Sequence, residues 1–469
     1  MLRNRCSRPS LHPLTALVLV SLGCANSVSA QNRFLGSIPS GQATSATIDL
    51  SLKQALERAL QYNLGGVESA QDVRAAHAMR LRNLNALLPN VSARVSASVE
   101  QLDLKALGFN IHIPGFSIPT VVGPFSVGDA RAYFSEELFN WSSIENWKSA
   151  SESEKAAQYG YKSDRDLVVY TTGNAYLLVI SDLAAVESTR AQVDTAQTLY
   201  QNGVDQNKAG VIASIDLLRA KVELQAQQQR LIAAKNQLAI DKLMLARIIG
   251  LPSGQEFHLT DSVPYAPVGE IGLDQALRQA RAARPDYLSA GARLHAAELA
   301  SKAAAAENYP SLSTATDFGD IGSPNFASSH ETMDFSVSLN IPIFQGSRVR
   351  ADKLQADAAL QQRRAELADL EGKIDDDVRT AFFNLKSSSE LVAVTKSNID
   401  LANQTLTQAQ DRFKAGVADN LEVVQAQESV ASANQSNIAS LYAYNLAKIS
   451  LAQAMGIAEH SALQYLGVR

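Results

Sequence analysis

Two periodicities of apolar residues divide the chain into short and long segments. Residues 333–341 alternate apolar and polar side chains without a break, and residues 91–99 alternate small apolar with polar ones. Residues 312–318 and 129–139 follow the same pattern less regularly. Because successive side chains of a strand point to opposite faces, a period of two predicts β-strands. The pattern therefore predicts four strands in two pairs.

Long segments of a different kind follow each pair of predicted strands. Residues 142–206 and 347–415 contain no proline and few glycines. At 1.5 Å per residue, each predicts a helix of roughly 90–100 Å, which is longer than a globular domain. Residues 214–249 and 420–455 are also free of proline and predict shorter helices that run back.

Apolar residues recur every seven positions on two of these predicted helices. A sustained repeat of seven predicts left-handed coiled-coil packing. The first set is Leu217, Leu224, Leu231, Leu238 and Leu245, and the second set is Leu385, Val392, Ile399, Leu406 and Phe413. Small residues lie three positions after most members of the second set and let helices approach closely.

The sequence Lys-Ala-Gly-Val occurs twice, each time where a long predicted helix ends. Glycine at the end of a helical pattern is the usual left-handed cap, so each copy predicts a tight turn between antiparallel helices. An acid follows each turn at the same distance, Asp216 in the first copy and Glu422 in the second. The two turns comprise residues 208–211, with Lys208, Gly210 and Val211, and residues 414–417, with Lys414, Gly416 and Val417.

Matched segments indicate that the chain is a duplication. Residues 52–56 and 273–277 read LKQAL and LDQAL, and the strands, helices and turns follow in the same order in each half. We predict a linker at residues 31–46 and two structural repeats, at residues 47–260 and 261–469.

Each predicted repeat begins with an amphipathic helix, at residues 51–88 and 273–308, and the second is expected to break near Pro285. The first repeat is longer than the second between its strands. Residues 101–128 are rich in proline and glycine. They are therefore predicted to be an inserted loop, on the extracellular side if the strands cross a membrane.

The N-terminus reads as an export signal at residues 1–30. Arginines precede the apolar run 14–22, and Val28-Ser29-Ala30 has the small-x-small pattern of a cleavage site. A membrane anchor is the alternative, but the run is shorter than the roughly 20 residues of a spanning helix. A lipoprotein signal acylated at Cys24 is a second alternative. No later stretch is expected to span a membrane as a helix, so membrane insertion would use the strands.

Strands of about ten alternating residues fit a transmembrane barrel, although a half-buried strand of a soluble sheet gives the same pattern. Four strands do not close a barrel, and an open edge in lipid leaves backbone groups unpaired. Two chains give eight strands and a filled interior, whereas three give twelve and a lumen. The polar face formed by Ser92, Arg94, Ser96 and Ser98 favours the trimer.

Composition argues against catalysis and nucleic-acid binding. The net charge of −5 comes without a lysine- or arginine-rich block. The 7 histidines are scattered, and nucleophile, phosphate-loop and dinucleotide motifs are missing from the sequence. The acids at residues 375–377 point in different directions on a helix, so we expect a solvated or lumen-facing charge run. We predict no cofactor, no metal site and no enzymatic activity.

The order of strands, long helices and turns, repeated twice, resembles the TolC-like outer membrane efflux proteins. The resemblance covers the whole chain after residue 30. It implies a mainly α fold with four transmembrane strands per chain, closed by a homotrimer into a 12-stranded barrel in outer-membrane lipid. It also implies a periplasmic α-helical coiled-coil tunnel. The implied partners are a periplasmic adaptor protein and an inner-membrane transporter of the RND, ABC or MFS type, with no nucleic acid.

The same resemblance implies a gate at the hairpin tips. Glu422 matches the position of an acidic ring that narrows the periplasmic entrance, Gln425 lies one turn further on, and Asp216 is the first-repeat equivalent. Phe413 stands where the family can have a tyrosine that bonds across to a neighbouring helix. Phenylalanine has no hydroxyl for this bond, so Asp419 is an alternative contributor. Both acids also suit a helix N-terminus, where the dipole favours negative charge. The two turns themselves are the implied adaptor-docking tips.

We therefore expect a passive outer-membrane exit duct of a tripartite efflux or type I secretion system, opened at its periplasmic end by the adaptor or transporter. The first hairpin is expected to be fixed and the second to move. The alternative is a soluble periplasmic coiled-coil protein with a structural or adaptor-like role.

Overall fold

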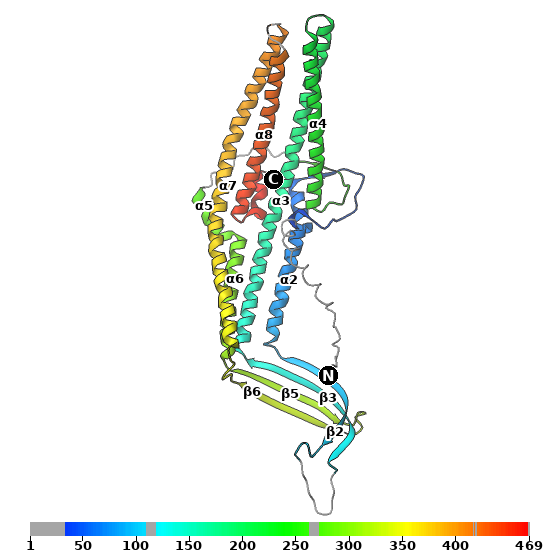
Figure 1. Ribbon diagram of the computed structural model, residues 1–469, viewed down its shortest axis with the longest axis vertical. Coiled ribbons are helices and arrows are strands. Elements are labelled where there is room, and N and C mark those ends of the chain that lie inside the picture. The colour runs from blue at the N-terminus through cyan, green and yellow to red at the C-terminus, as the bar shows by residue number, and fades with distance from the viewer. Residues whose placement is uncertain (1–32, 109–118, 262–271, 416, 418–419, 468–469) are drawn as a thin grey trace, which may run out of the picture. The chain divides into compact units, whose positions relative to one another are not determined.

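The computed structural model describes residues 33–108, 119–261, 272–415, 417 and 420–467 (Figure 1). The predicted signal at residues 1–30 lies outside them. The chain forms two compact units. Unit 1 comprises residues 1–68, 164–272 and 380–469, and unit 2 comprises residues 69–163 and 273–379. Each unit therefore combines segments from both halves of the sequence.

The strands of unit 2 form one antiparallel sheet. Its members are β2 (Asn90–Asp103), β3 (Val121–Phe139), β5 (Ser311–Gly322) and β6 (Ser329–Asn340), in the order β2-β3-β5-β6. The prediction of four alternating strands is confirmed, and each strand is longer than its alternating core. The sheet forms because neighbouring strands pair in register along almost their full length.

The predicted loop at residues 101–128 is longer than the loop in the structure. Strand β2 continues to Asp103 and β3 begins at Val121, with Leu102 opposite Val122. The register shifts between Glu100 and Leu102, beside Pro124, which the sequence analysis took as a sign of a loop. Proline is tolerated at such a bulge because the ladder is already interrupted there. The described loop residues are therefore confined to the stretch between the two strands.

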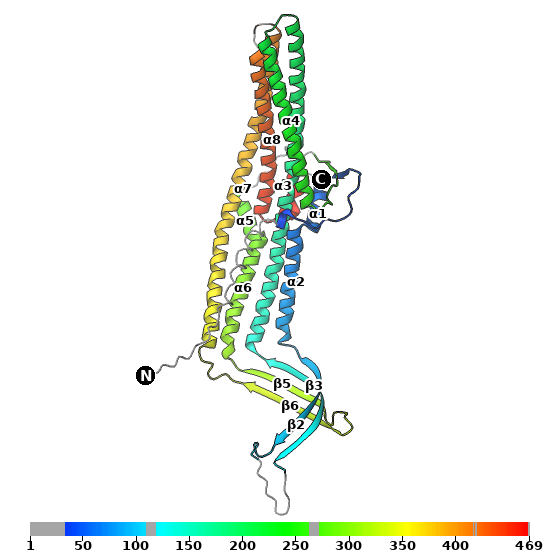
Figure 2. The same ribbon diagram turned by 45° about the vertical axis from the view of Figure 1, so that its right-hand side comes forward.

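Four helical segments of unit 2 lie side by side next to the sheet (Figure 2). They are α2 (Leu64–Asn85), α6 (Pro285–Ala305) and the N-terminal parts of α3 (Trp141–Lys208) and α7 (Arg348–Lys414). The short helices α5 (Leu273–Ala283) and η2 (Ala306–Asn308) flank α6.

The predicted break near Pro285 is confirmed. Pro285 is the first residue of α6, where the missing N–H costs nothing. The preceding Arg284 is buried and bonds Asp286 and Asp377 at 2.7 and 3.1 Å. Asp375 pairs with Arg281 at 2.9 Å, so two of the three adjacent acids form ion pairs with residues at this break.

Unit 1 contains two long helical hairpins, formed by the C-terminal parts of α3 and α7 with α4 (Ser214–Ile248) and α8 (Asn420–Ala454). All four helices begin and end within about two residues of the predicted limits, as expected from the accuracy of helix boundaries. At 1.5 Å per residue, the 68 residues of α3 extend over roughly 100 Å.

The seven-residue repeats form the packed seams of these hairpins. Every member of both sets is buried or half-buried, and Leu224 and Leu245 are 7% and 0% exposed. The small residues Ser388, Thr395 and Ala409 are buried too. The coiled-coil prediction is confirmed in the spacing of the buried positions.

A compact core in unit 1 was not predicted. Strands β1 (Ile48–Leu50) and β4 (Phe257–Leu259) pair in parallel and pack with α1 (Leu52–Tyr62) and α9 (Ala458–Leu466). Three-residue strands carry too little alternation to be recognised in a sequence. The buried Tyr176 hydroxyl of α3 donates to the Leu50 carbonyl at 3.0 Å and fixes this layer to the long helix.

The first amphipathic helix is broken at Asn63, which the sequence analysis missed. Ser51 and Gln54 form a capping box that starts α1, and the extended backbone of Asn63 ends it. The Asn63 amide is fully buried and donates to the carbonyls of Phe34, in the short helix η1 (Arg33–Leu35), and Ile248 at 2.8 and 3.3 Å. These contacts favour the break over a continuous helix.

Among the residues that the structure describes, one helix, α3, is long and apolar enough to cross a membrane by length and composition. The sequence analysis did not expect this. An 18-residue window has a mean hydropathy of 1.3, and 44% of it is buried inside the structure. Val168, Val179 and neighbouring residues of α3 belong to the unit 1 core, which accounts for the apolar composition.

Candidate functional site

The sheet of unit 2 has one apolar and one polar face. Residues directly opposite each other on antiparallel strands share a face. The register therefore places the apolar sets of β2 and β6 on one surface, to which β3 contributes Ala130, Ala132 and Phe134 and β5 contributes Leu312 and Phe318. Its large side chains are exposed, between 54% and 74% for the following: Val91, Val95, Val99, Phe318, Met333, Phe335, Val337 and Leu339.

The opposite face of the sheet carries hydroxyl and charged groups. Arg131 forms ion pairs with Asp129 on its own strand and with Asp317 of β5, the latter at 3.3 Å. Arg94 of β2 lies over the ring of Tyr133, 5.6 Å from its centre. A sheet with lipid on one side and water on the other requires this distribution.

The sheet is open at both sides. Strands β2 and β6 are its edges, and within the described residues neither pairs with a strand on its outer side. All 14 residues of β2 are exposed in the single chain. Long unpaired edges bind further strands, and in lipid they must do so.

The first hairpin tip follows helix α3. Gly210 has φ +74°, the left-handed conformation that glycine adopts without strain. The Val211 amide donates back to the Gln206 carbonyl at 2.9 Å, which closes the end of the helix. Val211 is 71% exposed and Lys208 is exposed beside it. The predicted turn at residues 208–211 is confirmed.

The second tip has the same backbone bonding. The Val417 amide donates to the Arg412 carbonyl at 3.1 Å, as Val211 does to Gln206. Val417 is 68% exposed. Gly416 and Asp419 lie outside the described residues, as does the side chain of Lys414.

The acids at the two tips have different partners. Asp216, in the first turn of α4, pairs with Arg219 of the same helix at 3.2 Å. Glu422, in the first turn of α8, pairs with Arg412 of α7 at 3.3 Å, so its ion pair bridges the two arms of the hairpin. Both acids occupy positions that the helix dipole favours.

Phe413 packs into a small apolar cluster near the second tip. Its half-buried ring joins Ala409 of α7 with Val423 of α8, and Leu199 of α3 packs against the same cluster. Gln425 is exposed, and its backbone carbonyl accepts a hydrogen bond from the hydroxyl four residues on. Phe413 therefore contacts a cluster that includes both hairpins, whereas Gln425 faces solvent.

The sequence analysis did not identify Arg412. It lies on α7 before the second tip, ten positions before its partner Glu422. The sequence contained one signal for this pair, namely a cation shortly before the tip and an acid shortly after it. That spacing brings two side chains together only once the turn geometry is known.

A strand sheet with one apolar and one polar face, together with paired long helical hairpins, is the set of elements expected of a channel in the outer membrane. Residues 55–251 and 276–457 match the sequence model of the family described as outer membrane efflux protein. The chain belongs to this family, which acts in efflux across the outer membrane. Its sheet lies in that membrane and its long hairpins in the periplasm.

Individual relatives and solved structures agree with the family. The pyoverdine export outer membrane protein OpmQ of Pseudomonas aeruginosa is 25% identical over 419 residues, covering 86% of this chain and 85% of its own. The Campylobacter jejuni CmeC outer membrane channel superposes with a TM-score of 0.76 at 16% identity, covering 96% and 94%. VceC of Vibrio cholerae gives 0.74 at 18% identity, covering 86% and 96%. These two structures share the fold.

Proposed function

We propose that three copies of this chain form the passive exit duct of a tripartite export system. The four strands of each chain contribute one third of a 12-stranded barrel, and the hairpins continue it as a periplasmic tunnel. The chain supplies a path and a gate, and it performs no chemistry on what passes. A soluble coiled-coil or adaptor-like role is disfavoured, because such a protein has no use for an exposed apolar sheet face.

The observation that carries this proposal is the four-stranded sheet with one exposed apolar face and two open edges. In water this face exposes eight large side chains, which a monomeric soluble protein avoids. In lipid the same face is satisfied, but the edges then require partners. Joining β6 of one chain to β2 of the next satisfies both requirements. Eight strands would leave no lumen, whereas twelve leave one around the polar face.

Cysteine crosslinking between the open edges tests the barrel and its stoichiometry. The native cysteines, Cys6 and Cys24, both fall in the predicted signal, so single cysteines can be placed on an otherwise cysteine-free mature chain. We would combine one cysteine at residues 92–98 of β2 with one at residues 332–338 of β6 and oxidise the purified membranes.

We expect one register to yield covalent dimers and trimers on denaturing gels, with no larger species. A ladder that stops at the dimer indicates an eight-stranded barrel and refutes the duct. Absence of crosslinks in every register, or recovery of the protein in the soluble periplasm, refutes edge-to-edge closure altogether.

We further propose that the second tip is the gate. In a trimer, three copies of Glu422 and Arg412 surround the axis, and opening requires the α7–α8 hairpin to move against the α3–α4 hairpin. The ion pair between the arms of the second tip and the cluster around Phe413 support this assignment. Asp216, paired within its own helix, suits a fixed outer hairpin.

The exposed tips are the proposed contact with the periplasmic adaptor. Val211 and Val417 are both largely exposed at equivalent places of the two turns. Two equivalent apolar tips per chain give six in the trimer, which suits an adaptor that binds in several copies. The adaptor in turn would join the duct to an inner-membrane transporter. Relatives of this chain are named for pyoverdine export, antibiotic efflux and solvent efflux, so the relatives alone do not assign the cargo.

A further inference from the structure

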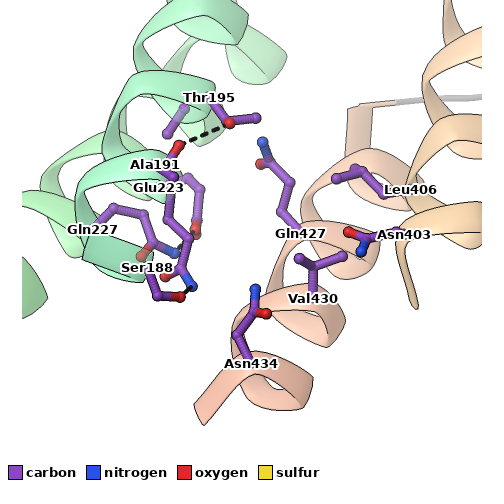
Figure 3. Close-up of a pocket in the computed structure, with 12 residues that line it drawn as sticks. Ser188, Ala191, Thr195, Glu223, Gln227, Asn403, Leu406, Gln427, Val430 and Asn434 are labelled. Carbon is purple, nitrogen blue, oxygen red and sulfur yellow. Dashed lines mark hydrogen bonds between the residues drawn. The ribbon is translucent and has the colours of Figure 1, made fainter. Parts of the chain in front are cut away.

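A cavity lies between the two hairpins of unit 1 (Figure 3). Its volume is about 340 Å³, at the lower end of the roughly 300–1,000 Å³ of small-molecule sites. Residues from α3 and α4 line one side and residues from α7 and α8 the other. Seven of the 12 lining residues carry an amide or hydroxyl group, and the apolar part consists of Leu406, Val430, Ala191 and Ala196.

Two hydrogen-bond acceptors in this cavity have no partner among the described residues. They are Oε1 of Gln227, on α4, and Oε1 of Gln427, on α8. The two side chains are only 2% and 8% exposed. Gln227 donates its Nε2 to Glu223 at 2.6 Å, which fixes the orientation of its amide and leaves the carbonyl oxygen for a ligand. Buried unpaired acceptors are costly, so an occupant with N–H or O–H donors is required.

The only acid among the lining residues is Glu223. It forms no salt bridge within the part of the chain that the structure describes. Arg230, whose charge interacts with that of Glu223, is held by Glu428 of α8 in a two-pronged contact of 2.8 and 3.1 Å. The cavity therefore presents one carboxylate and two amide carbonyls, all acceptors, next to an apolar wall.

We propose that this cavity binds a small organic cation with several N–H donors, such as an alkylguanidinium or alkylammonium compound. Its charged end would lie against Glu223 and donate to the Gln227 and Gln427 carbonyls, and its carbon chain would contact Leu406 and Val430. Water is the competing occupant, but water supplies no positive charge for Glu223. Because the acceptors belong to different hairpins, one ligand bridges both.

Calorimetric titration of the purified full-length protein in detergent tests the site. Agmatine, which carries a guanidinium and an ammonium group, serves as the probe, and butylurea serves as a neutral comparison of similar length. We expect saturable binding of one agmatine per chain and binding of butylurea at least about tenfold weaker, since a charge-assisted bond is lost.

Matched variants separate this site from general attraction to an acidic protein. Glu223→Gln and Gln427→Leu should each weaken agmatine binding by about tenfold or more, whereas Glu390→Gln, which removes the same charge at an exposed position of α7 outside the cavity, should change it less than about twofold. Unchanged circular dichroism and melting would show that the variants fold. If agmatine shows no saturable binding at millimolar concentration, or if Glu390→Gln weakens it as much as Glu223→Gln, the site is refuted. The measurement needs no channel activity, so its failure leaves the proposed function untouched.

Discussion

The ion pair between Arg412 and Glu422 makes the proposed gate testable by charge. Both side chains are about half exposed, 57% and 46%, so the pair is expected to contribute only about 0–1 kcal/mol to stability. Its effect on ions at the entrance is a separate quantity. A guanidinium within 3.3 Å of the carboxylate offsets much of the attraction that Glu422 exerts on a passing cation.

Replacing Arg412 with glutamine removes this counter-charge. At contact distance in a water-like environment, the interaction between two unit charges has an energy of about 1 kcal/mol, which corresponds to roughly a fivefold change in affinity. We therefore expect divalent cations added on the tip side to block the Arg412→Gln channel in planar bilayers at about one fifth of the wild-type concentration. Glu422→Gln should weaken the block, and the double variant should resemble Glu422→Gln.

The first tip supplies the control. Arg219→Gln breaks the equivalent pair with Asp216, which we place on the fixed hairpin, so block should stay within about twofold of wild type. If Arg412→Gln and Glu422→Gln both leave block and conductance unchanged, Glu422 does not line the path. Its position would then reflect only the preference of a helix N-terminus for an acid.

Three further predictions concern assembly and stability. Asn63→Ala should lower the free energy of unfolding by about 2–4 kcal/mol, because the substitution leaves two buried carbonyls unpaired. Urea unfolding in detergent measures this loss of stability. Val95→Lys, on the apolar face, should abolish outer-membrane assembly, because a lysine near the bilayer centre costs about 2–4 kcal/mol per chain. Ser96→Lys, on the polar face, should assemble normally, and membrane fractionation measures both variants. Burial and a hydrogen bond that the protonated Asp182 donates to the Asp241 carboxylate raise the pKa of Asp182 to about 7. Between pH about 4 and 7 the folded chain therefore holds a proton that the unfolded chain has lost, so stability should fall as pH rises, and Asp182→Asn should remove that slope.

Each of these has a matched control or a contradicting result. Asp194→Asn, at an exposed position of the same helix, should keep the pH slope; if it removes the slope as Asp182→Asn does, the buried pair is not the cause. Equal assembly of Val95→Lys and Ser96→Lys would mean that the apolar face does not meet lipid. A loss below about 0.5 kcal/mol for Asn63→Ala would show that water replaces its bonds.

Long repetitive elements of this protein were predictable from the sequence alone. The four alternating strands, the ends of the long helices and the turn at Gly210 all depend on local patterns that repeat over many residues. Each pattern has one low-energy backbone solution, so a long run of it outweighs tertiary contacts. The heptad positions belong to the same class, because the seven-residue spacing itself decides which side chains meet.

Features that depend on residues distant in sequence were decided only by the tertiary structure. Nothing near Asn63 predicts a break, which exists because its amide reaches carbonyls contributed by residues 34 and 248. The partner of Glu422 depends on how tightly the second turn closes. The cavity between the hairpins depends on where Gln227 and Gln427 face each other. Such contacts depend on the packing of the whole unit, and no local periodicity in the sequence predicts them.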